Sequence, residues 1–281
     1  MGALDGKVAV VTGATSGIGE RIAEVFVEEG AQVVATGRRE QEGAALANKL
    51  REKVIFFRAD VSQEPDVQAT FDLVVQRFGR LDALVNNAGQ STPLISIAEL
   101  DMAVFDNLMN VNIRGLVMCM KYAARIMLPQ GTGSIINIAS LAASRGGMTA
   151  HPYSASKGAV CAVTRSVAAE LGEKGIRVNV ISPGAIVTGI FAKNAGVEGS
   201  KADKVAGAVR DVFATLQPVP RAGEPEDVAR AAVFLASDAS SFINGHELAV
   251  DGDITQAARR WSDGLAIRAQ LATQIKAAAG E

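Results

Sequence analysis

Short, continuously apolar runs separated by helix-length segments limit the fold of this chain most strongly. The runs VAVV at 8–11 and IINI at 135–138 show no polar alternation, which is typical of strands covered on both faces of a sheet. Seven strands are expected, in KVAVVT, AQVVAT, KVIFFRA, LDALVNN, GSIINIAS, IRVNVISP and HELAVDG. Helix-length segments occupy residues 17–29, 40–52, 65–78, 99–127, 153–173 and 225–236. With right-handed crossovers, this alternation predicts an α/β fold: a doubly wound (Rossmann) seven-stranded parallel sheet with helices on both faces.

The domain organisation follows from length and from the absence of linkers. A chain of 281 residues, 48% of them hydrophobic, can bury a large core, and no repeat or Pro/Gly-rich linker divides it. We expect one domain over 1–255. Residues 189–217, rich in small residues, fit either a substrate lid or a plain surface helical hairpin. Residues 256–281 are expected to form a C-terminal helical extension, used for docking or oligomerisation or simply frayed.

Charge and composition exclude several kinds of partner. The formal net charge is −2 and there is no basic tract, so neither nucleic acid nor an anionic membrane is expected as the main partner. No leader-like or membrane-spanning segment is evident, which predicts a soluble, cytoplasmic protein. Cys119 and Cys161 lie in apolar helical patterns and are interpreted as buried free thiols. His151 and His246 build no metal-ligand cluster, so no metal is expected.

The first strand ends in TGATSGIG, residues 12–19, and leads directly into a helix. Gly13 permits a tight turn, Gly17 lets the backbone approach a dinucleotide, and Gly19 allows close helix packing. The N–H groups at the helix N-terminus are donors for a pyrophosphate. A glycine-rich loop without a ligand is the alternative interpretation.

Tyr153 and Lys157 are four residues apart in an expected helix and therefore share one face. A tyrosine titrates near pH 10, so acid–base work near neutrality requires lowering its pKa by roughly 3 units, or about 4 kcal/mol. A cation about 4 Å away contributes roughly 4 kcal/mol at an effective dielectric near 20. The pair therefore predicts a proton-transfer site, whereas alone it would equally describe an exposed surface pair.

Several motifs in one order resemble the short-chain dehydrogenase/reductase family, in its shorter TGxxxGxG type. They are TGATSGIG at 12–19, ADV at 59–61, NNAG at 86–89, VNIRG at 111–115, Ser140, YSASK at 153–157, SPG at 182–184 with Thr188, and VDG at 250–252. The resemblance implies Tyr153 as general acid/base, Lys157 as the residue that lowers its pKa and holds the nicotinamide ribose, Ser140 as the substrate-oxygen donor and Asn112 as part of a water-linked proton relay. From the sequence alone, Ser140 is equally a turn serine and Asn112 a satisfied core amide.

The resemblance also implies a set of binding residues. For the coenzyme these are Gly13, Thr15, Ser16, Gly17, Ile18, Gly19, Arg38, Arg39, Asp60, Val61, Asn87, Ala88, Gly89, Tyr153, Lys157, Pro183, Gly184, Ile186 and Thr188. For the substrate they are Ser140, Ala142, His151, Tyr153 and Ile190. Asp60 could accept from the adenine amino group or merely cap the next helix. His151 could line the pocket or be structural.

Coenzyme choice depends on the end of the second strand, VVATGRRE. An NAD-selective site would place a carboxylate there for the ribose hydroxyls. In this chain the position is occupied by Gly37, which is followed by Arg38 and Arg39. Guanidinium groups suit a 2′-phosphate. NADP(H) is therefore favoured, with NAD(H) possible if the arginines are only solvated surface charges.

Together these features predict an oxidoreductase that interconverts a secondary alcohol and a ketone. The substrate is expected to be mainly apolar, since charged residues are few in LAASRGGMTAH and AIVTGIF, and a homotetramer is expected by resemblance. The alternatives are a catalytically silent dinucleotide sensor or scaffold, and an epimerase or dehydratase of the same fold, which would need GxxGxxG spacing. The chain departs from the family's VDGG at Asp253, which leaves the C-terminal turn open.

Overall fold

The computed structural model describes residues 2–197, 199–257 and 260–279, and its centre is a seven-stranded sheet. The strands are β1 Val8–Thr12, β2 Gln32–Gly37, β3 Val54–Arg58, β4 Ala83–Asn86, β5 Gly133–Ile138, β6 Ile176–Pro183 and β7 Glu247–Val250. Their order in the sheet is β3-β2-β1-β4-β5-β6-β7, and every neighbouring pair is parallel. The predicted fold class is confirmed.

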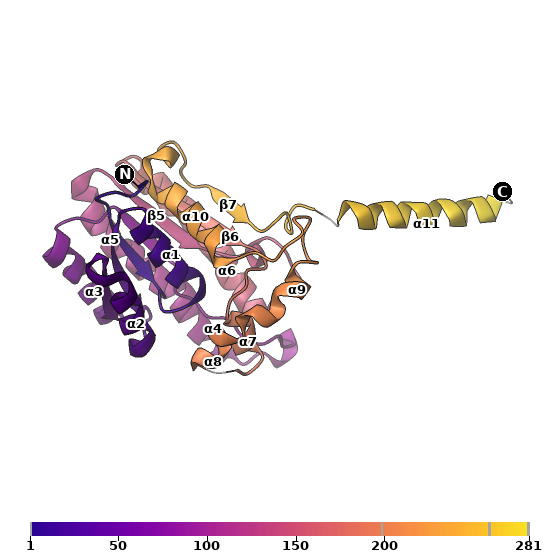
Figure 1. The fold of residues 1–281 in the computed structure, drawn as a ribbon, viewed down its shortest axis with the longest axis horizontal. Helices are drawn as coiled ribbons and strands as arrows, with labels where there is room; N and C mark the ends of the chain where they lie inside the picture. Colours follow the sequence, from indigo (N-terminus) through magenta and orange to yellow (C-terminus); the bar gives the residue numbers. More distant parts are fainter. Residues whose placement is uncertain (1, 198, 258–259, 280–281) are drawn as a thin grey trace.

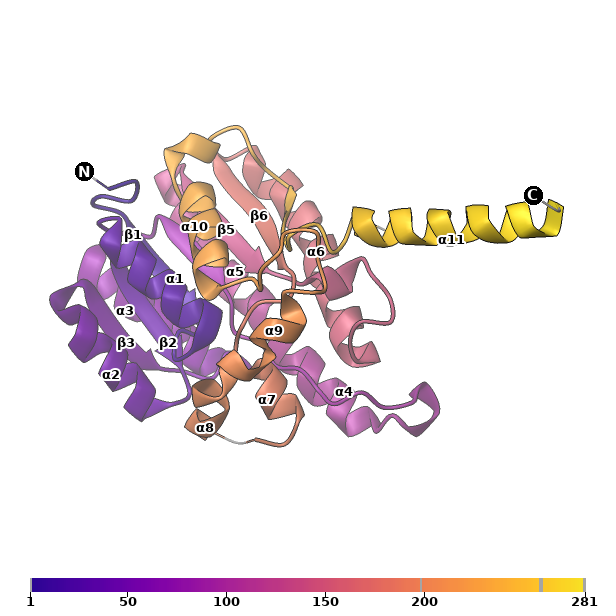
Figure 2. The ribbon, with the colours of Figure 1, turned by 45° about the vertical axis from the view of Figure 1, so that its right-hand side comes forward.

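Helices cover both faces of the sheet (Figures 1 and 2). Those that follow the strands are α1 Gly17–Glu28, α2 Glu40–Leu50, α3 Glu64–Phe78, α4 Met102–Met109, α5 Leu116–Gln130, α6 His151–Gly172 and α10 Pro225–Ala236. The shorter α7 Ile190–Asn194, α8 Gly199–Lys204 and α9 Arg210–Phe213 lie between β6 and α10, and α11 Trp261–Ala279 ends the chain.

Two of the three apolar clusters correspond to the two faces of the sheet, and the third, smaller one lies around Phe213 and Ile254. One core joins the sheet to α1, α2 and α10 and contains the fully buried Phe26 and Ile22. The other joins it to α3, α5 and α6 and contains Phe71 and Val160. Burying one such large side chain stabilises the fold by roughly 1.5–3 kcal/mol. Because both faces are covered, the strands need apolar residues at every position, which explains their continuous runs.

Local sequence signals set several helix ends. α10 begins with a capping box in which Glu224 and Asp227 each accept from the other's backbone, and Pro225 occupies the first turn. α3 also has a proline in its first turn, and it ends at Gly79, whose φ of 68° lies in the left-handed region. These signals fix the residues at which the helices begin and end, and so the point at which the chain enters the next strand.

The segment predicted as one helix over 99–127 is more complex. α4 and α5 are joined by a π-helical turn over Asn110–Gly115, and α5 continues to Gln130. Asn112 within this turn is 1% exposed. The π turn adds one residue to the helix and directs the Asn112 amide inward, a distortion that is frequent at functional sites.

The last part of the chain leaves the core. Arg145 donates to the carbonyl groups of Ile254 and Ala257 and fixes the chain there. Beyond it, α11 extends away from the body of the molecule (Figure 1) with Trp261 and Ile275 exposed. α11 lies within the segment predicted as a C-terminal extension, and the extent and docking role of that extension remain predictions. No helix in the described part of the chain is long and apolar enough to cross a membrane.

Asp253, where the resembled family has a second glycine, occupies a left-handed backbone position with φ 75°. Aspartate is one of the few residues other than glycine that tolerate this region. Its N–H donates to the Asp251 carboxylate at 2.9 Å, and the Thr255 N–H donates to the same carboxylate at 2.9 Å. The turn therefore keeps a glycine-like conformation without the glycine.

Candidate active site

Two connected clefts lie at the carboxyl ends of the strands. One is a cavity of about 580 Å³ lined by Ser140, Tyr153 and Lys157. The other, of about 500 Å³, is lined by Gly13 and the rest of the phosphate-binding turn. Residues common to both linings are Ile18, Asn87, Gly89, Ser91, Thr188 and Ile190. Ligands bind at this edge in open parallel sheets, so the arrangement provides a coenzyme cleft opening onto a substrate cavity.

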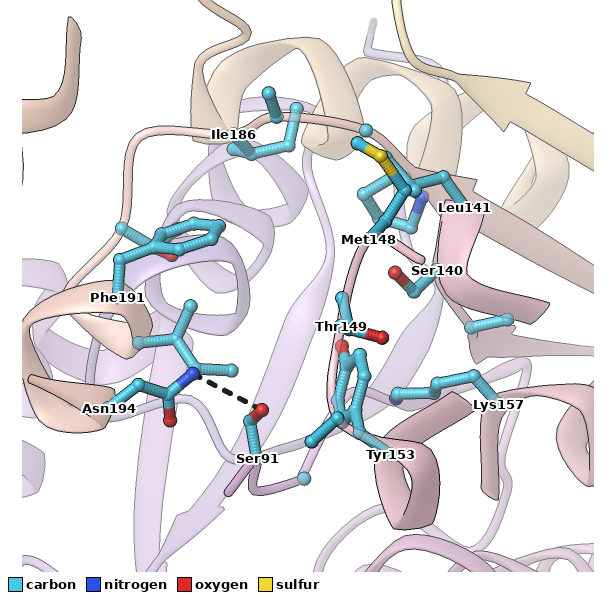
Figure 3. A pocket seen from close by; sticks show the side chains of 18 of the residues that line it. Ser91, Ser140, Leu141, Met148, Thr149, Tyr153, Lys157, Ile186, Phe191 and Asn194 are labelled. Atoms are coloured by element: carbon cyan, nitrogen blue, oxygen red, sulfur yellow. Dashed lines mark hydrogen bonds between the residues drawn. The ribbon is translucent and has the colours of Figure 1, made fainter. Parts of the chain in front are cut away.

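The candidate catalytic side chains come from two places. Tyr153 and Lys157 lie one turn apart on α6, and Ser140 lies two residues after the end of β5 (Figure 3). The Lys157 Nζ is 5.5 Å from the centroid of the Tyr153 ring and donates to the Ile138 carbonyl at 2.8 Å. Ser140 Oγ accepts from the Ala142 N–H at 3.2 Å, which holds the hydroxyl at the cavity wall. The predicted Tyr–Lys–Ser group is thus brought together.

The electrostatics of this group differ from the sequence-based expectation. Burial raises the pKa of Tyr153, and the hydrogen bond with Ser140 lowers it by less. Burial also lowers the pKa of Lys157 to about 8. The Lys157 ammonium is directed to the Ile138 carbonyl, and burial penalises its own charge. The pKa of Tyr153 is thus raised and not lowered as the sequence led us to expect, and a lowering by Lys157 remains a prediction.

Asn112 does not line either cleft but lies directly behind the catalytic helix. Its Oδ1 accepts from the Gln90 N–H at 2.9 Å, and its Nδ2 donates to the Gln90 carbonyl at 2.9 Å and to Ser156 Oγ at 3.0 Å. Its amide therefore ties the loop after β4 to α6. A Cβ at Gly89 would approach Asn112 Oδ1 to 3.4 Å and Lys157 Nζ to 3.6 Å, so the loop passes close to both. The structure shows a hydrogen-bonded core amide, and the proton relay remains a prediction.

The glycine-rich turn is shaped to approach a dinucleotide. Gly13 and Gly17 have φ values of 66° and 59°, which favour glycine. A Cβ at Gly19 would lie 2.4 Å from the Gly13 carbonyl oxygen, so the turn folds tightly on the helix. Ser16, at the N-cap of α1, makes no side-chain capping bond, which leaves N–H donors of the first turn for a ligand. These residues fit the pyrophosphate of a nicotinamide dinucleotide.

The NNAG motif is tied to this turn by hydrogen bonds that the sequence did not reveal. Thr12 Oγ1 accepts from the N–H groups of Asn87 at 3.1 Å and Ala88 at 3.0 Å. Asn87 Nδ2 donates to the carbonyls of Thr12 at 3.0 Å and Gly13 at 3.1 Å. Thr12 was not among the predicted site residues. Its position at the end of β1, facing the end of β4, was the available signal.

The end of β2 carries no carboxylate, and Gly37 is packed closely against Thr15. A Cβ at Gly37 would lie 2.7 Å from Thr15 Cγ2. Arg38 has a side chain 65% exposed and lies 3.7 Å from Asp60, whereas Arg39 donates to the Thr15 carbonyl at 2.9 Å and to Asp203 at 2.7 Å. Arg38 is therefore the more available guanidinium.

Asp60 lines the coenzyme cleft but does not cap α3, whose N-cap is Gln63. Its Oδ1 accepts from the Ser62 N–H at 2.9 Å and from the Ser62 hydroxyl at 2.8 Å. Burial by itself raises the pKa of Asp60, but the two Ser62 hydrogen bonds and nearby arginines bring it below its usual value. The carboxylate is thus an ionised acceptor at the edge of the cleft.

The remaining predicted residues divide by position. Those lining at least one of the clefts are Thr15, Ser16, Ile18, Val61, Ala88, Pro183, Gly184, Ile186, Thr188 and Ile190. Gly19 lies behind the cleft. Ala142 is 4% exposed in the short turn Leu141–Ala143, and His151 is exposed at the start of α6; neither lines the substrate cavity.

The sequence analysis missed the cavity walls formed by Leu94 and Phe213, whereas Met148 and Phe191 lie in LAASRGGMTAH and AIVTGIF, the segments from which an apolar substrate was predicted. Met148 and Leu94 contribute from the loops after β5 and β4, and Phe213 and Phe191 meet edge to face with ring centroids 4.7 Å apart. Asn194 on α7 donates to Ser91 Oγ at 3.3 Å across the opening (Figure 3). Their position in loops after strand ends was the only signal available.

Fold and site together define an NAD(P)-dependent oxidoreductase of the dinucleotide-binding α/β class. A family profile described as "Enoyl-(Acyl carrier protein) reductase" matches residues 13–255. The chain is 42% identical over 255 residues to "(+)-borneol dehydrogenase 2" of Salvia officinalis, covering 89% of each chain. It is 44% identical over 247 residues to "L-fucose dehydrogenase" of Oryctolagus cuniculus, covering 88% of this chain and 84% of the relative. It is 38% identical over 256 residues to "Xanthoxin dehydrogenase" of Arabidopsis thaliana, covering 89% and 90%.

The chain belongs to the short-chain dehydrogenase/reductase family. It is an oxidoreductase that acts on alcohols and ketones with a nicotinamide coenzyme. The predicted family and enzyme class are confirmed.

Proposed function

We propose that this enzyme interconverts a mainly apolar secondary alcohol and its ketone, with NADP(H) as the favoured coenzyme and NAD(H) as the alternative. The observation that carries the proposal is the convergence of Tyr153, Lys157 and Ser140 on an apolar cavity that opens onto the coenzyme cleft. A silent sensor would need only the coenzyme cleft, so the second cavity and its polar group favour catalysis.

The proposed roles follow from what each side chain can donate or accept. When bound, the nicotinamide coenzyme supplies or takes the hydride. Ser140 donates its hydroxyl to the substrate oxygen and orients it, and Tyr153 delivers or removes the proton at that oxygen. Lys157, with a pKa lowered to about 8, exchanges its own proton near neutral pH and holds the ribose through its remaining donors. The Asn112 network keeps α6 and the loop after β4 in position, and a relay through it to solvent is part of the proposal.

The apolar lining supports the substrate class. Leu141, Met148, Ile186 and Phe191 surround the catalytic group (Figure 3). Among the polar residues of the lining, Asn194 bonds to Ser91 and Thr149 bonds to Ser154, which leaves few polar groups for a substrate. A polyhydroxylated substrate would leave hydroxyl groups unpaired against these walls, which is unfavourable. Among the relatives, whose names include both borneol and L-fucose, the cavity therefore favours a ligand of the borneol kind.

Preference for NADP(H) is supported by the end of β2. No carboxylate is present at Gly37, and Arg38 lines the cleft with an exposed guanidinium, a group that binds phosphate strongly. Kinetics with NADPH and NADH in wild type and Arg38→Ala test this. The variant should raise the KM for NADPH by about tenfold and leave that for NADH almost unchanged. Equal KM values for the two coenzymes in the wild type would refute NADP preference.

The activity itself is tested by following the absorbance of the reduced nicotinamide with panels of apolar cyclic ketones, secondary alcohols and sugars. Turnover of apolar ketones at lower KM than sugars is expected. Coenzyme binding without turnover of any substrate would instead favour the silent sensor. The proposal includes a homotetramer in the cytoplasm, which light scattering and cell fractionation test directly.

A further inference from the structure

The second guanidinium at the end of β2 is already engaged by the protein. Arg39 Nε donates to Thr15 Oγ1 at 3.3 Å, and its Nη2 donates to the Thr15 carbonyl at 2.9 Å and to Thr15 Oγ1 at 3.3 Å. Its Nη1 donates to Asp203 Oδ2 at 2.7 Å and lies 3.6 Å from Glu42 Oε1. Every nitrogen of the group has a partner, although Arg39 lines the coenzyme cleft.

Asp203 belongs to α8, in the segment between β6 and α10 that was predicted to be a lid. It connects three places: Arg39 at the coenzyme cleft, Lys193 Nζ on α7 at 3.3 Å, and Gly189, where an added Cβ would lie 2.2 Å from Asp203 Oδ1. The side chains of Arg39 and Asp203 are each only 26% exposed. A partly buried pair is screened less than an exposed one, so it can hold α7 and α8 against the loop after β1.

We propose that Asp203 is a positioning residue that holds this lid closed through Arg39 and competes with a coenzyme 2′-phosphate for that guanidinium. The Asp203 carboxylate occupies the face of Arg39 that an incoming phosphate would need, since Thr15 takes the other donors. A coenzyme without the 2′-phosphate leaves the pair intact. A coenzyme that carries the 2′-phosphate must displace Asp203 from Arg39 or bind through Arg38 alone. The contact that holds the lid therefore depends on which coenzyme is bound, and the same lid carries Phe191 and Asn194 of the substrate cavity.

This inference rests on the proposed coenzyme cleft, but its first test needs no coenzyme. Hydrogen–deuterium exchange of the unliganded protein should be roughly tenfold faster over residues 190–213 in Asp203→Asn than in wild type, because the lid opens more often. Two control variants also lose one negative charge but leave the contact between Arg39 and Asp203 intact. Glu42→Gln removes the weaker partner of Arg39 outside the lid, and Asp211→Asn removes an exposed lid carboxylate; both should exchange as the wild type does.

The second test measures coenzyme affinity by calorimetry. In Asp203→Asn the ratio of the Kd for NADH to the Kd for NADPH should increase roughly tenfold, because Arg39 is freed for phosphate. The double variant Arg39→Ala with Asp203→Asn should have the same ratio of Kd values as Arg39→Ala alone. Unchanged lid exchange, or an unchanged ratio in Asp203→Asn, overturns the inference. If neither coenzyme binds, the proposed function fails, and the exchange experiment still decides whether the pair holds the lid.

Discussion

The floor of the substrate cavity and its lid are built from different interactions. The floor consists of β4, β5, α6 and the π turn, joined by buried side-chain hydrogen bonds such as Asn112 to Ser156 at 3.0 Å and Asn137 to Thr164 at 2.9 Å. The segment proposed as the lid consists of short helices that are held by partly exposed ion pairs, such as Arg39 with Asp203, by the contact of Phe191 with Phe213, and by a small apolar cluster around Phe213. The two walls of the cavity therefore differ in the share of buried hydrogen bonds that hold them.

This difference separates two tasks of the enzyme. Proton transfer requires the reacting groups to be held within a fraction of an ångström, which buried hydrogen bonds on regular elements provide. Admission of a ligand requires an element of low local stability, which short helices with exposed backbone provide. Substitutions in the floor should therefore change the rate of chemistry or the stability of the fold, whereas substitutions in the lid should change KM.

The largest effect is expected at Tyr153. Tyr153→Phe removes only the phenolic oxygen, so kcat should fall by about 10²–10⁴-fold while the Tm stays close to that of wild type. Steady-state kinetics and thermal unfolding of the same preparations measure both. Full turnover by this variant would disprove the role of the floor in proton transfer.

A pH-dependent stability effect is expected at Lys157. Its pKa is lowered to about 8 in the folded protein from 10.5 when solvated, so the unfolded state binds the proton more tightly. The folded state is then penalised below pH 8, and its stability rises as the pH increases from about 8 to 10.5, by up to about 3 kcal/mol. Urea unfolding of wild type and Lys157→Met at several pH values in this range measures the difference between their free energies of unfolding. A difference independent of pH would mean that the amine is not desolvated.

Asn112 provides the next test of the floor. Asn112→Ala removes the side-chain partner of the Gln90 N–H and carbonyl and the donor to Ser156 Oγ, so the free energy of unfolding should decrease by about 1–3 kcal/mol. Asn107→Ala, at an exposed position of α4, is the matched control and should change it by less than about 0.5 kcal/mol. Equal effects of the two substitutions, measured by urea unfolding, would show that the amide network does not support the floor.

The smallest effect is expected in the lid. Phe191→Ala removes one edge-to-face contact at a position that is 37% exposed, so stability should decrease by about 1 kcal/mol or less. The KM for an apolar substrate should increase several-fold with kcat nearly unchanged, because the cavity loses a wall and not a reacting group. A large fall in kcat with unchanged KM would show that the lid and the floor do not divide the work in this way.

The sequence predicted the sheet because buried parallel strands need apolar residues at each position, and it predicted the coenzyme turn because glycine is required there. It could not predict the surroundings of Tyr153. His151 is only two residues away, but positions i and i+2 of a helix point in different directions, so one lines the cavity and the other is exposed. Ala142 is turned inward by the short turn after Ser140.

The lid shows the same limit over a longer range. Arg39 and Asp203 are 164 residues apart in sequence, and neither position alone signals that the arginine is engaged by a carboxylate. The sign of the Tyr153 pKa shift also depended on tertiary structure, because burial raises the pKa and the hydrogen bond with Ser140 offsets only part of that rise. Spacing brings two residues to one helical face but does not give the orientation of their charged ends.

The π turn over Asn110–Gly115 has a consequence for how the helix tolerates change in length. A π turn is the arrangement that one inserted residue produces in a continuous α-helix. Successive residues of an α-helix are rotated by about 100° about the helix axis. Deleting a single residue there would restore regular winding and turn the Leu108 side of α4 relative to α5 by that angle. Length variation among descendants of this gene should therefore be accepted in the loops on either side and rejected inside these six positions.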